Sequence, residues 1–329
     1  MSSRKSSSGK FPFFLTGFVL VVVAIYCGYW VWMSGVIKQG ALDWVDDQRA
    51  MGREVSYSDL SVGGFPFRFV LEAENPILGD PDMQSRWEGD QLQMIAMSWN
   101  LHHIMVRTPG ANFLSLPDLE PFTLTASSKS IASLRIEDGY LRRFGLTFPE
   151  AEAITETGRQ FTLTGFELGL APMPNSPDDL QFALSLETLD LPNAIPDAEW
   201  LGEEVRELII WIEVEDFYPV AEGRKSQVDW RLDESKIHLR RGEIDMGPLD
   251  LASRASFTLD RDLNPDGTVG VHLSRIDELK AALRTAGLLT TENEFVITTI
   301  GNISKNDNFA TVRVQDRKIS LLGRTLAEY

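Results

Sequence analysis

The chain starts with one long apolar stretch and continues with short segments in which apolar and polar residues alternate. Residues 11–37 carry no charged side chain. Within them, residues 15–34 have the length of about 20 apolar residues that a helix needs to cross hydrocarbon. Aromatic residues lie at both ends of the stretch, as at the two interfaces of a bilayer. The pattern predicts a transmembrane anchor over 11–37 that contacts the lipid bilayer through 15–34.

A cleaved signal peptide is the main alternative, because Arg4, Lys5 and Lys10 precede the apolar stretch. The stretch is longer than a signal peptide requires, and residues 29–34 offer no small-x-small cleavage site. We therefore expect an uncleaved, single-pass anchor. Positive charge before the helix favours a cytoplasmic tail over 1–10 and a C-terminal body outside the cytoplasm. In a bacterium, that arrangement places the anchor in the inner membrane and the body in the periplasm.

Beyond the anchor, the apolar period is first helical and then that of a strand. Ala41, Trp44, Val45, Gln48 and Met51 recur every three or four residues, which predicts a helical stalk over 38–54. Apolar residues then alternate with polar ones, as in strands with one wet face. The clearest predicted strands lie at 208–214, 228–232, 269–273 and 312–314. In the segment 161–170 the phase changes across Gly165, which predicts a bend or bulge.

Helices are few in the predicted body, and this decides the fold class. One amphipathic helix is expected over 276–286, with Ser274 and Asp277 as a capping box and Gly287 as its stop. A shorter one is expected from Asp197 to Glu204. Two helices cannot cover so many one-sided strands, so the sheet must fold onto itself as a sandwich, a barrel or a half-pipe.

The predicted fold is mainly β (α+β): an N-terminal transmembrane helix, then an elongated, curled antiparallel sheet over 55–329. If the body divides into two units, the boundary lies near 172–177. Two hairpins are expected near the C-terminus. One turns at residues 264–267, and the other joins 311–314 to 318–321.

Charge and cysteine content narrow the function classes. The chain has 31 basic and 48 acidic residues, a net charge of -17. The first 37 residues contribute +3, which leaves -20 for the rest. So acidic a body repels phosphate backbones, which argues against nucleic acid as a partner. It can serve solubility, or it can dock a protein partner. The single cysteine, Cys27, lies in the apolar stretch and excludes a disulfide scaffold.

Candidate chemical motifs fail on inspection. His102 and His103 are neighbours on a predicted strand, so they point to opposite faces. His238 and His272 fall on polar faces. An apparent calcium loop at 260–266 has Pro265 where a glycine is needed, and Val271 in place of the closing glutamate. We find no nucleophile elbow, phosphate loop or zinc helix. The sequence therefore predicts no catalytic residue, cofactor or metal, and the protein is not expected to be an enzyme.

The most distinctive string is GGFPFRF at residues 63–69. Alternation places Phe65, Phe67 and Phe69 on one face, with Arg68 opposite. Two interpretations stay open. The string can be a bulged strand entry that plugs the membrane-proximal end of the core. It can also be a membrane-facing lip that contacts lipid through Phe65, Phe67 and Phe69, with Arg68 placed for a lipid phosphate.

Two motifs in order resemble the bacterial family named domain of unknown function 2125. The first is YSDLSVGGFPFR at 57–68; the second is RRGEIDMGPL at 240–249, followed by Leu259-Asp260 and NPDG at 264–267. Met246 departs from the second pattern, where a tryptophan is expected. The resemblance implies an envelope protein without an assigned activity. The layout is also loosely similar to AsmA-like envelope proteins, which are linked to lipid movement or outer-membrane homeostasis, a likeness of layout only.

These features favour a membrane-anchored envelope protein that binds or guides a lipid through an apolar β trough. The alternative is a structural or assembly factor, not an enzyme, that docks a protein partner on its acidic face.

Overall fold

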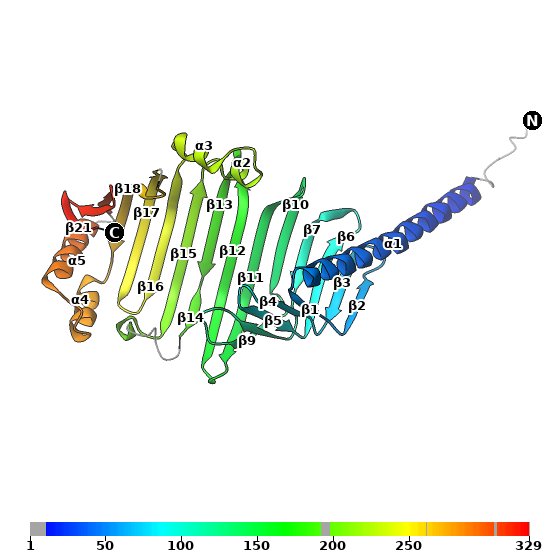
Figure 1. Ribbon diagram of the computed structural model, residues 1–329, viewed down its shortest axis with the longest axis horizontal. Coiled ribbons are helices and arrows are strands. Elements are labelled where there is room, and N and C mark those ends of the chain that lie inside the picture. Colours follow the sequence, from blue (N-terminus) through cyan, green and yellow to red (C-terminus); the bar gives the residue numbers. More distant parts are fainter. Residues whose placement is uncertain (1–10, 192–197, 261, 306–307, 329) are drawn as a thin grey trace, which may run out of the picture.

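The computed structural model describes residues 11–191, 198–260, 262–305 and 308–328, with side chains from Phe14 onward. A single antiparallel sheet forms the body, a long helix leaves it at one end, and two shorter helices lie at the other (Figure 1). The fold is mainly β, as predicted.

The strands of the first half are β1 (Glu54–Ser56), β2 (Asp59–Gly63), β3 (Arg68–Glu74), β4 (Ile77–Asp80), β5 (Ser85–Gly89), β6 (Gln91–Met97), β7 (Asn100–Arg107), β8 (Ala111–Ser115), β9 (Phe122–Ala126), β10 (Ile131–Glu137) and β11 (Tyr140–Thr155). Those of the second half are β12 (Gln160–Met173), β13 (Ser176–Leu186), β14 (Thr188–Asp190), β15 (Glu204–Val214), β16 (Ile237–Met246), β17 (Leu249–Leu259), β18 (Pro265–Leu273), β19 (Ala310–Gln315), β20 (Lys318–Leu321) and β21 (Arg324–Glu328). The helical elements are α1 (Phe11–Ala50), the 3-10 turn η1 (Glu199–Leu201), α2 (Phe217–Ala221), α3 (Gln227–Leu232), α4 (Ile276–Thr285) and α5 (Thr291–Ser304).

Helix α1 unites the predicted anchor and the predicted stalk. It runs for 40 residues without interruption and ends at Ala50, before a turn at Gly52. It is long and apolar enough to cross a membrane, judged by length and composition alone, and its apolar half is almost wholly exposed. Its second half packs against β1, β2 and β3. The segment after the predicted anchor is therefore helical, as expected; it forms a wall of the body and ends at Ala50, four residues before the predicted end of the stalk.

The long strand β11 divides the sheet into two arms. Its first half pairs with β10 and its second half with β9. From β10, the first arm continues through β7, β6 and β3 to β2; from β9, the second arm continues through β8, β5 and β4 to β1. Helix α1 contacts the last strand of each arm, β2 and β1. The arms and the helix thus enclose one end of the body.

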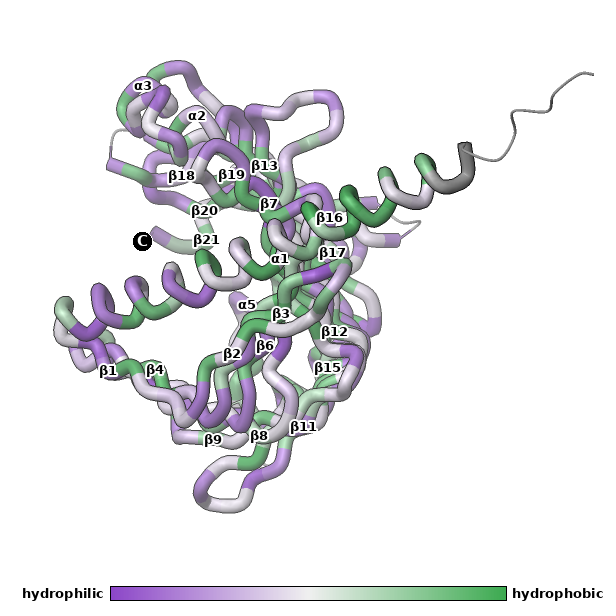
Figure 2. Tube along the Cα trace, turned by 90° about the vertical axis from the view of Figure 1, so that its right-hand side faces the viewer, coloured by the Kyte–Doolittle hydropathy of each residue, from purple (hydrophilic) through white to green (hydrophobic). Residues whose placement is uncertain are grey.

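From β12 onward the sheet is a single antiparallel ribbon that ends at β21. Strands β12 and β13 form a hairpin across the boundary that the sequence placed near 172–177, so the sheet continues through it. Figure 2 shows the sheet curling around the side on which α1 and α5 lie, which is the half-pipe among the three predicted forms.

The bend predicted at Gly165 is present. Gly165 has φ +62°, and Leu163 and Phe166 on either side of it both pack against the cluster of Leu186, Val205 and Met246. Without the bend, alternation would place Leu163 and Phe166 on opposite faces. A Cβ at Gly165 would lie 2.3 Å from the side chain of Glu187. Both the positive φ and this close contact therefore favour glycine at the position.

The far end of the sheet is capped by α4 and α5, and here the helix predictions need correction. Helix α4 lies where expected, but Arg275 is its N-cap residue, without a side-chain capping bond, so the box at Ser274 and Asp277 is absent. Gly287 does follow its end with φ +71°. Helix α5 was not predicted from the sequence, although its Thr290 and Asn293 form a capping box. It contains the β-branched run at 296–300, which is more typical of strands.

Other local predictions were partly wrong. Residues 228–232 form helix α3 and not a strand, because Ser226 caps the helix by accepting a hydrogen bond from the Asp229 amide. The helix expected from Asp197 is the short turn η1, and Asp197 itself lies outside the described residues. The hairpin of β17 and β18 turns at 260–264 and not at 264–267, with Asp260 accepting from the Asn264 amide. The last predicted hairpin is confirmed as β19 and β20.

Candidate functional site

An apolar face runs without interruption along the inner side of the curled sheet. Directly paired residues form a first row that crosses twelve strands from β3 to β19, and every one of its members is apolar. The row is Phe69, Ala96, Ile104, Leu134, Phe144, Leu170, Phe182, Ile212, Leu239, Ala255, Val269 and Val312. A parallel second row runs from Leu71 to Ala310 and is apolar except at Gly242 and Ser253. We call these two rows the inner face.

Among the residues that the structure describes, the two ends of the inner face are covered and its middle is not. At the near end Phe69 is 2% exposed, and at the far end Ala310 is 0% exposed beneath α5. Between β7 and β16, the side chains of both rows remain partly exposed, apart from the buried Gly242. Helices α2 and α3 lie at the strand ends there, where α2 packs against β13 (Figure 1). Seven strands at about 4.8 Å spacing make this open part roughly 30 Å long.

A cavity of about 510 Å³ opens where the inner face meets α1. Helix α1 contributes Ile37, Ala41, Trp44 and Val45, and both arms contribute the other walls. The strand residues that line it include Val55, Leu60, Leu71, Leu78, Leu92 and Met94. Polar side chains are nearly absent from this lining, so the cavity suits an apolar ligand.

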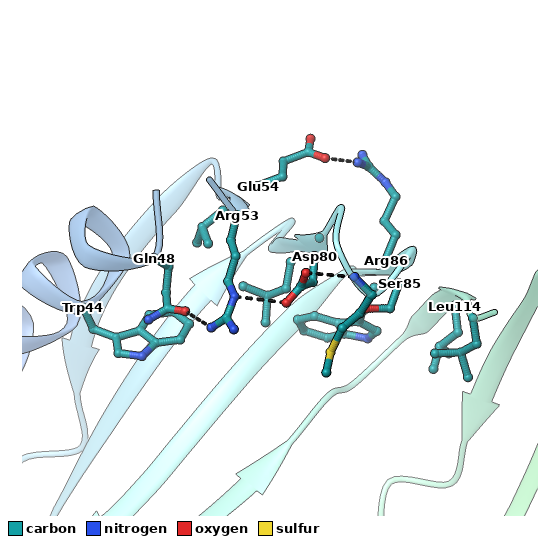
Figure 3. Close-up of a pocket in the computed structure, with 14 residues that line it drawn as sticks. Trp44, Gln48, Arg53, Glu54, Asp80, Ser85, Arg86 and Leu114 are labelled. Carbon is teal, nitrogen blue, oxygen red and sulfur yellow. Dashed lines mark hydrogen bonds and ion pairs between the residues drawn. The ribbon is translucent and has the colours of Figure 1, made fainter. Parts of the chain in front are cut away.

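A second cavity of about 430 Å³ adjoins the first and shares Trp44, Val55 and Leu78 with it. Its apolar lining includes Trp87 and Leu114 on the second arm. Figure 3 shows Leu114 on the side of the cavity opposite Trp44. Polar groups form the rim: Arg53 pairs with Asp80 at 3.1 Å and donates to the Gln48 amide oxygen at 2.6 Å. These side chains bond one another and form a connected polar rim above the apolar lining.

Charge at this rim is fixed by pairing. Arg86 bonds the carboxylates of Glu88 and Glu54, and the Glu88 hydrogen bond is the main reason that the pKa of Arg86 lies above its ordinary value. The pairs are partly exposed, so each contributes little to stability. They hold the ends of β1, β4 and β5 together at the mouth of the second cavity.

The four histidines considered as metal ligands do not come together in a metal site. His102 and His103 are adjacent on β7, and the His103 ring nitrogen bonds the Ser133 hydroxyl at 2.8 Å. His238 bonds Glu215 at 3.2 Å, and His272 bonds the Asn308 carbonyl at 3.0 Å. Within the part of the chain that is described, no three His, Cys, Asp or Glu side chains gather as metal ligands do.

The GGFPFRF string meets α1 at the start of β3. Residues 64–67 form a turn and not a strand, so the predicted alternation does not extend over all three phenylalanines. Phe69 is buried and stacks on Trp30 with ring centroids 5.3 Å apart. Phe65 meets the edge of Trp30 yet stays 55% exposed, and Phe67 is 66% exposed. Phe69 therefore plugs the core, while Phe65, Phe67 and Arg68 face outward.

Residues 30–323 match the model of the family domain of unknown function 2125, described as an uncharacterized protein conserved in bacteria. The chain belongs to this family. The match spans both cavities and the inner face, so the domain of unknown function 2125 includes the second half of α1 as part of the body. This confirms the resemblance drawn from the two sequence motifs. Neither a curated protein nor a solved structure matches the chain.

Sequence patterns located the inner face but not the cavities. Alternation identified the apolar strands, whereas the spacing of Ala41, Trp44 and Val45 was interpreted as a stalk. The same spacing is the signal for a helix that buries one side. The sequence pattern does not identify the surface against which this helix packs, because strands of two separate arms form that surface.

Proposed function

We propose that this protein is anchored in the bacterial inner membrane by α1 and binds lipid acyl chains on the inner face of a periplasmic sheet, without catalysis. The observation that supports this most is the pair of apolar rows that stays partly exposed over roughly 30 Å. Apolar surface left in water costs about 25 cal/mol per Å². A large contiguous apolar patch on a soluble surface marks a ligand or partner site.

An acyl chain fits this face better than a peptide does. A bound peptide needs partners for its own N–H and C=O groups. The inner face offers few, because the strand amides and carbonyls pair within the sheet and the side chains of the first row are all apolar. An acyl chain has no polar group to satisfy. The face also starts at an apolar helix of membrane-spanning length.

The packing of α1 favours a retained anchor over a cleaved leader. Tyr26, Tyr29 and Trp30 donate hydrogen bonds to backbone carbonyls of the body, and Val45 is 6% exposed against it. Cleavage after the apolar stretch would remove the partners of these carbonyls and uncover Phe69. The uncleaved chain keeps the body closed at this end.

Photo-crosslinking on one strand tests the lipid proposal. A benzophenone amino acid in place of Phe182 lies on the inner face, and one in place of the exposed Ala183 lies on the outer face of the same strand. We expect lipid adducts in cells at position 182 and several-fold fewer at position 183. Equal labelling at both positions, or adducts with proteins only at 182, would contradict lipid binding. A C-terminal phosphatase fusion tests the compartment separately, because it is active only in the periplasm.

A further inference from the structure

Two turns of the sheet close around α1 at one level, and we call this contact the collar: Tyr26, Tyr29 and Trp30 with residues 64–68 and 98–99. The Tyr26 hydroxyl donates to the Pro66 carbonyl and lies 2.8 Å from the Ser98 hydroxyl. Tyr29 donates to the Ser98 carbonyl at 3.0 Å, and Trp30 donates to the Arg68 carbonyl at 3.1 Å. The sequence predicted that aromatic residues at this end of the apolar stretch lie at a bilayer interface, and here three of them bond the sheet.

The collar lies within the apolar stretch and not beyond it. A span of about 20 residues, or about 30 Å, is needed to cross the hydrocarbon. The earliest such span that begins at Phe11 ends at Trp30, which places Tyr26 about 6 Å inside its boundary at 1.5 Å per residue. The latest span within 11–37 places Tyr26 about 16 Å inside. In either register, the leading edge of the sheet enters the leaflet together with the helix.

The surface of the collar is built for an apolar medium. Phe65, Phe67 and Trp99 project from its two turns with exposed fractions of 55, 66 and 70%. Four backbone carbonyls of the turns are satisfied without water: Pro66, Arg68 and Ser98 by the aromatic donors of α1, and Phe67 by the Ser98 amide at 3.1 Å. Irregular backbone is tolerated at membrane depth only when its polar groups are satisfied in this way.

We propose that the collar is embedded in the leaflet nearer the body, so that Phe65, Phe67 and Trp99 contact the acyl chains of that leaflet. This rests on the membrane anchor of the proposed function. Behind the collar, Phe69 is buried against Trp30, and the apolar cavity beside Ile37 and Trp44 lies further along α1. Arg68, which is exposed at the start of β3, extends its guanidinium toward lipid phosphates.

Depth-dependent quenching tests this on the full chain. Cys27→Ala removes the only cysteine, and a fluorescent label is then placed through Val21→Cys, Phe67→Cys or Met83→Cys, one at a time. Met83 is the control, because it is 66% exposed like Phe67 but lies at the β4–β5 turn. The labelled proteins are reconstituted in vesicles of phosphatidylethanolamine and phosphatidylglycerol, and quenching by acyl-brominated lipid is compared with quenching by iodide.

We expect labels at 21 and 67 to be quenched by brominated lipid at least three-fold more than the label at 83, and iodide to show the reverse order. If 21 responds to lipid while 67 behaves like 83, the collar lies in water and the inference is wrong, although the anchor stands. If 21 also behaves like 83, then α1 is not in the membrane, and the anchor and the collar fail together.

Discussion

Replacing Phe69 with alanine tests whether the GGFPFRF string holds α1 to the sheet. Phe69 is 2% exposed and its ring lies nearly parallel to that of Trp30, with an interplanar angle of 18°. Truncation of a buried phenylalanine costs about 3–5 kcal/mol, which includes the lost apolar transfer, the cavity and the ring contact. At about 2 °C per kcal/mol for a body of this size, the melting temperature should fall by roughly 6–10 °C.

The matched control is Phe67→Ala, two residues earlier in the same string. Its ring is 66% exposed and its removal leaves no cavity, so we expect a change within about 0.5 kcal/mol. Both variants are compared with the parent chain in detergent, by circular dichroism during heating. Equal melting temperatures for Phe69→Ala and Phe67→Ala would refute the division of the string into a buried plug and an exposed lip.

Two further predictions concern the body away from α1. Gly247 has φ +51°, and a Cβ there would lie 2.0 Å from the Leu201 carbonyl oxygen. Gly247→Ala should therefore lower the free energy of unfolding by about 1–2 kcal/mol for the backbone conformation plus about 1–3 kcal/mol for the clash. Gly139→Ala, at φ +83° with open space around it, should show only the first of these costs, and urea unfolding measures both variants. Hydrogen bonds from Thr157 and Arg159 lower the pKa of Glu120 from 4.5 to about 2. Because the folded pKa lies below the unfolded one, Glu120 stabilises the fold above pH 4.5 and loses this effect as the pH falls toward 2. The stability difference between the parent chain and Glu120→Gln should therefore be present near neutral pH and shrink across that window; a constant difference would count against the pairing.

How far the sequence predicts this fold depends on which contacts are local. Alternation identified β15, β18 and β19 and their apolar faces, because strand period is a property of each segment alone. The pairing of β5 with β8, and of β11 with β9, joins strands that are not neighbours in the sequence, whereas β10 and β11 form a local hairpin. No periodicity encodes such pairs, so the two arms and the cavities between them could not be predicted.

Local patterns also misled where tertiary packing prevailed. Val228, Trp230 and Leu232 alternate like a strand, yet Trp230 donates to the Glu215 carbonyl at 2.6 Å from within a capped helix. The β-branched residues of α5 favour a strand by propensity, but Ile297 and Ile300 are buried against the inner face. At the GGFPFRF string, sequence left the plug and the lip as alternatives. In the structure, Phe69 is the plug and the two phenylalanines before it are exposed, because packing against Trp30 buries only the Phe69 ring.

The two ends of the inner face are not equivalent, and this constrains any movement of lipid along it. At the far end, Leu279 and Leu283 of α4 and Ile297 and Ile300 of α5 are buried on the same face, in one cluster with Leu273 and Val312. A chain lying in the rows would have to displace this cluster to pass beyond β17. The near end instead meets α1 and the collar. Under the proposed function, the trough is blind at α5, so a lipid would enter and leave along its open side. A conduit between two membranes would need both ends open.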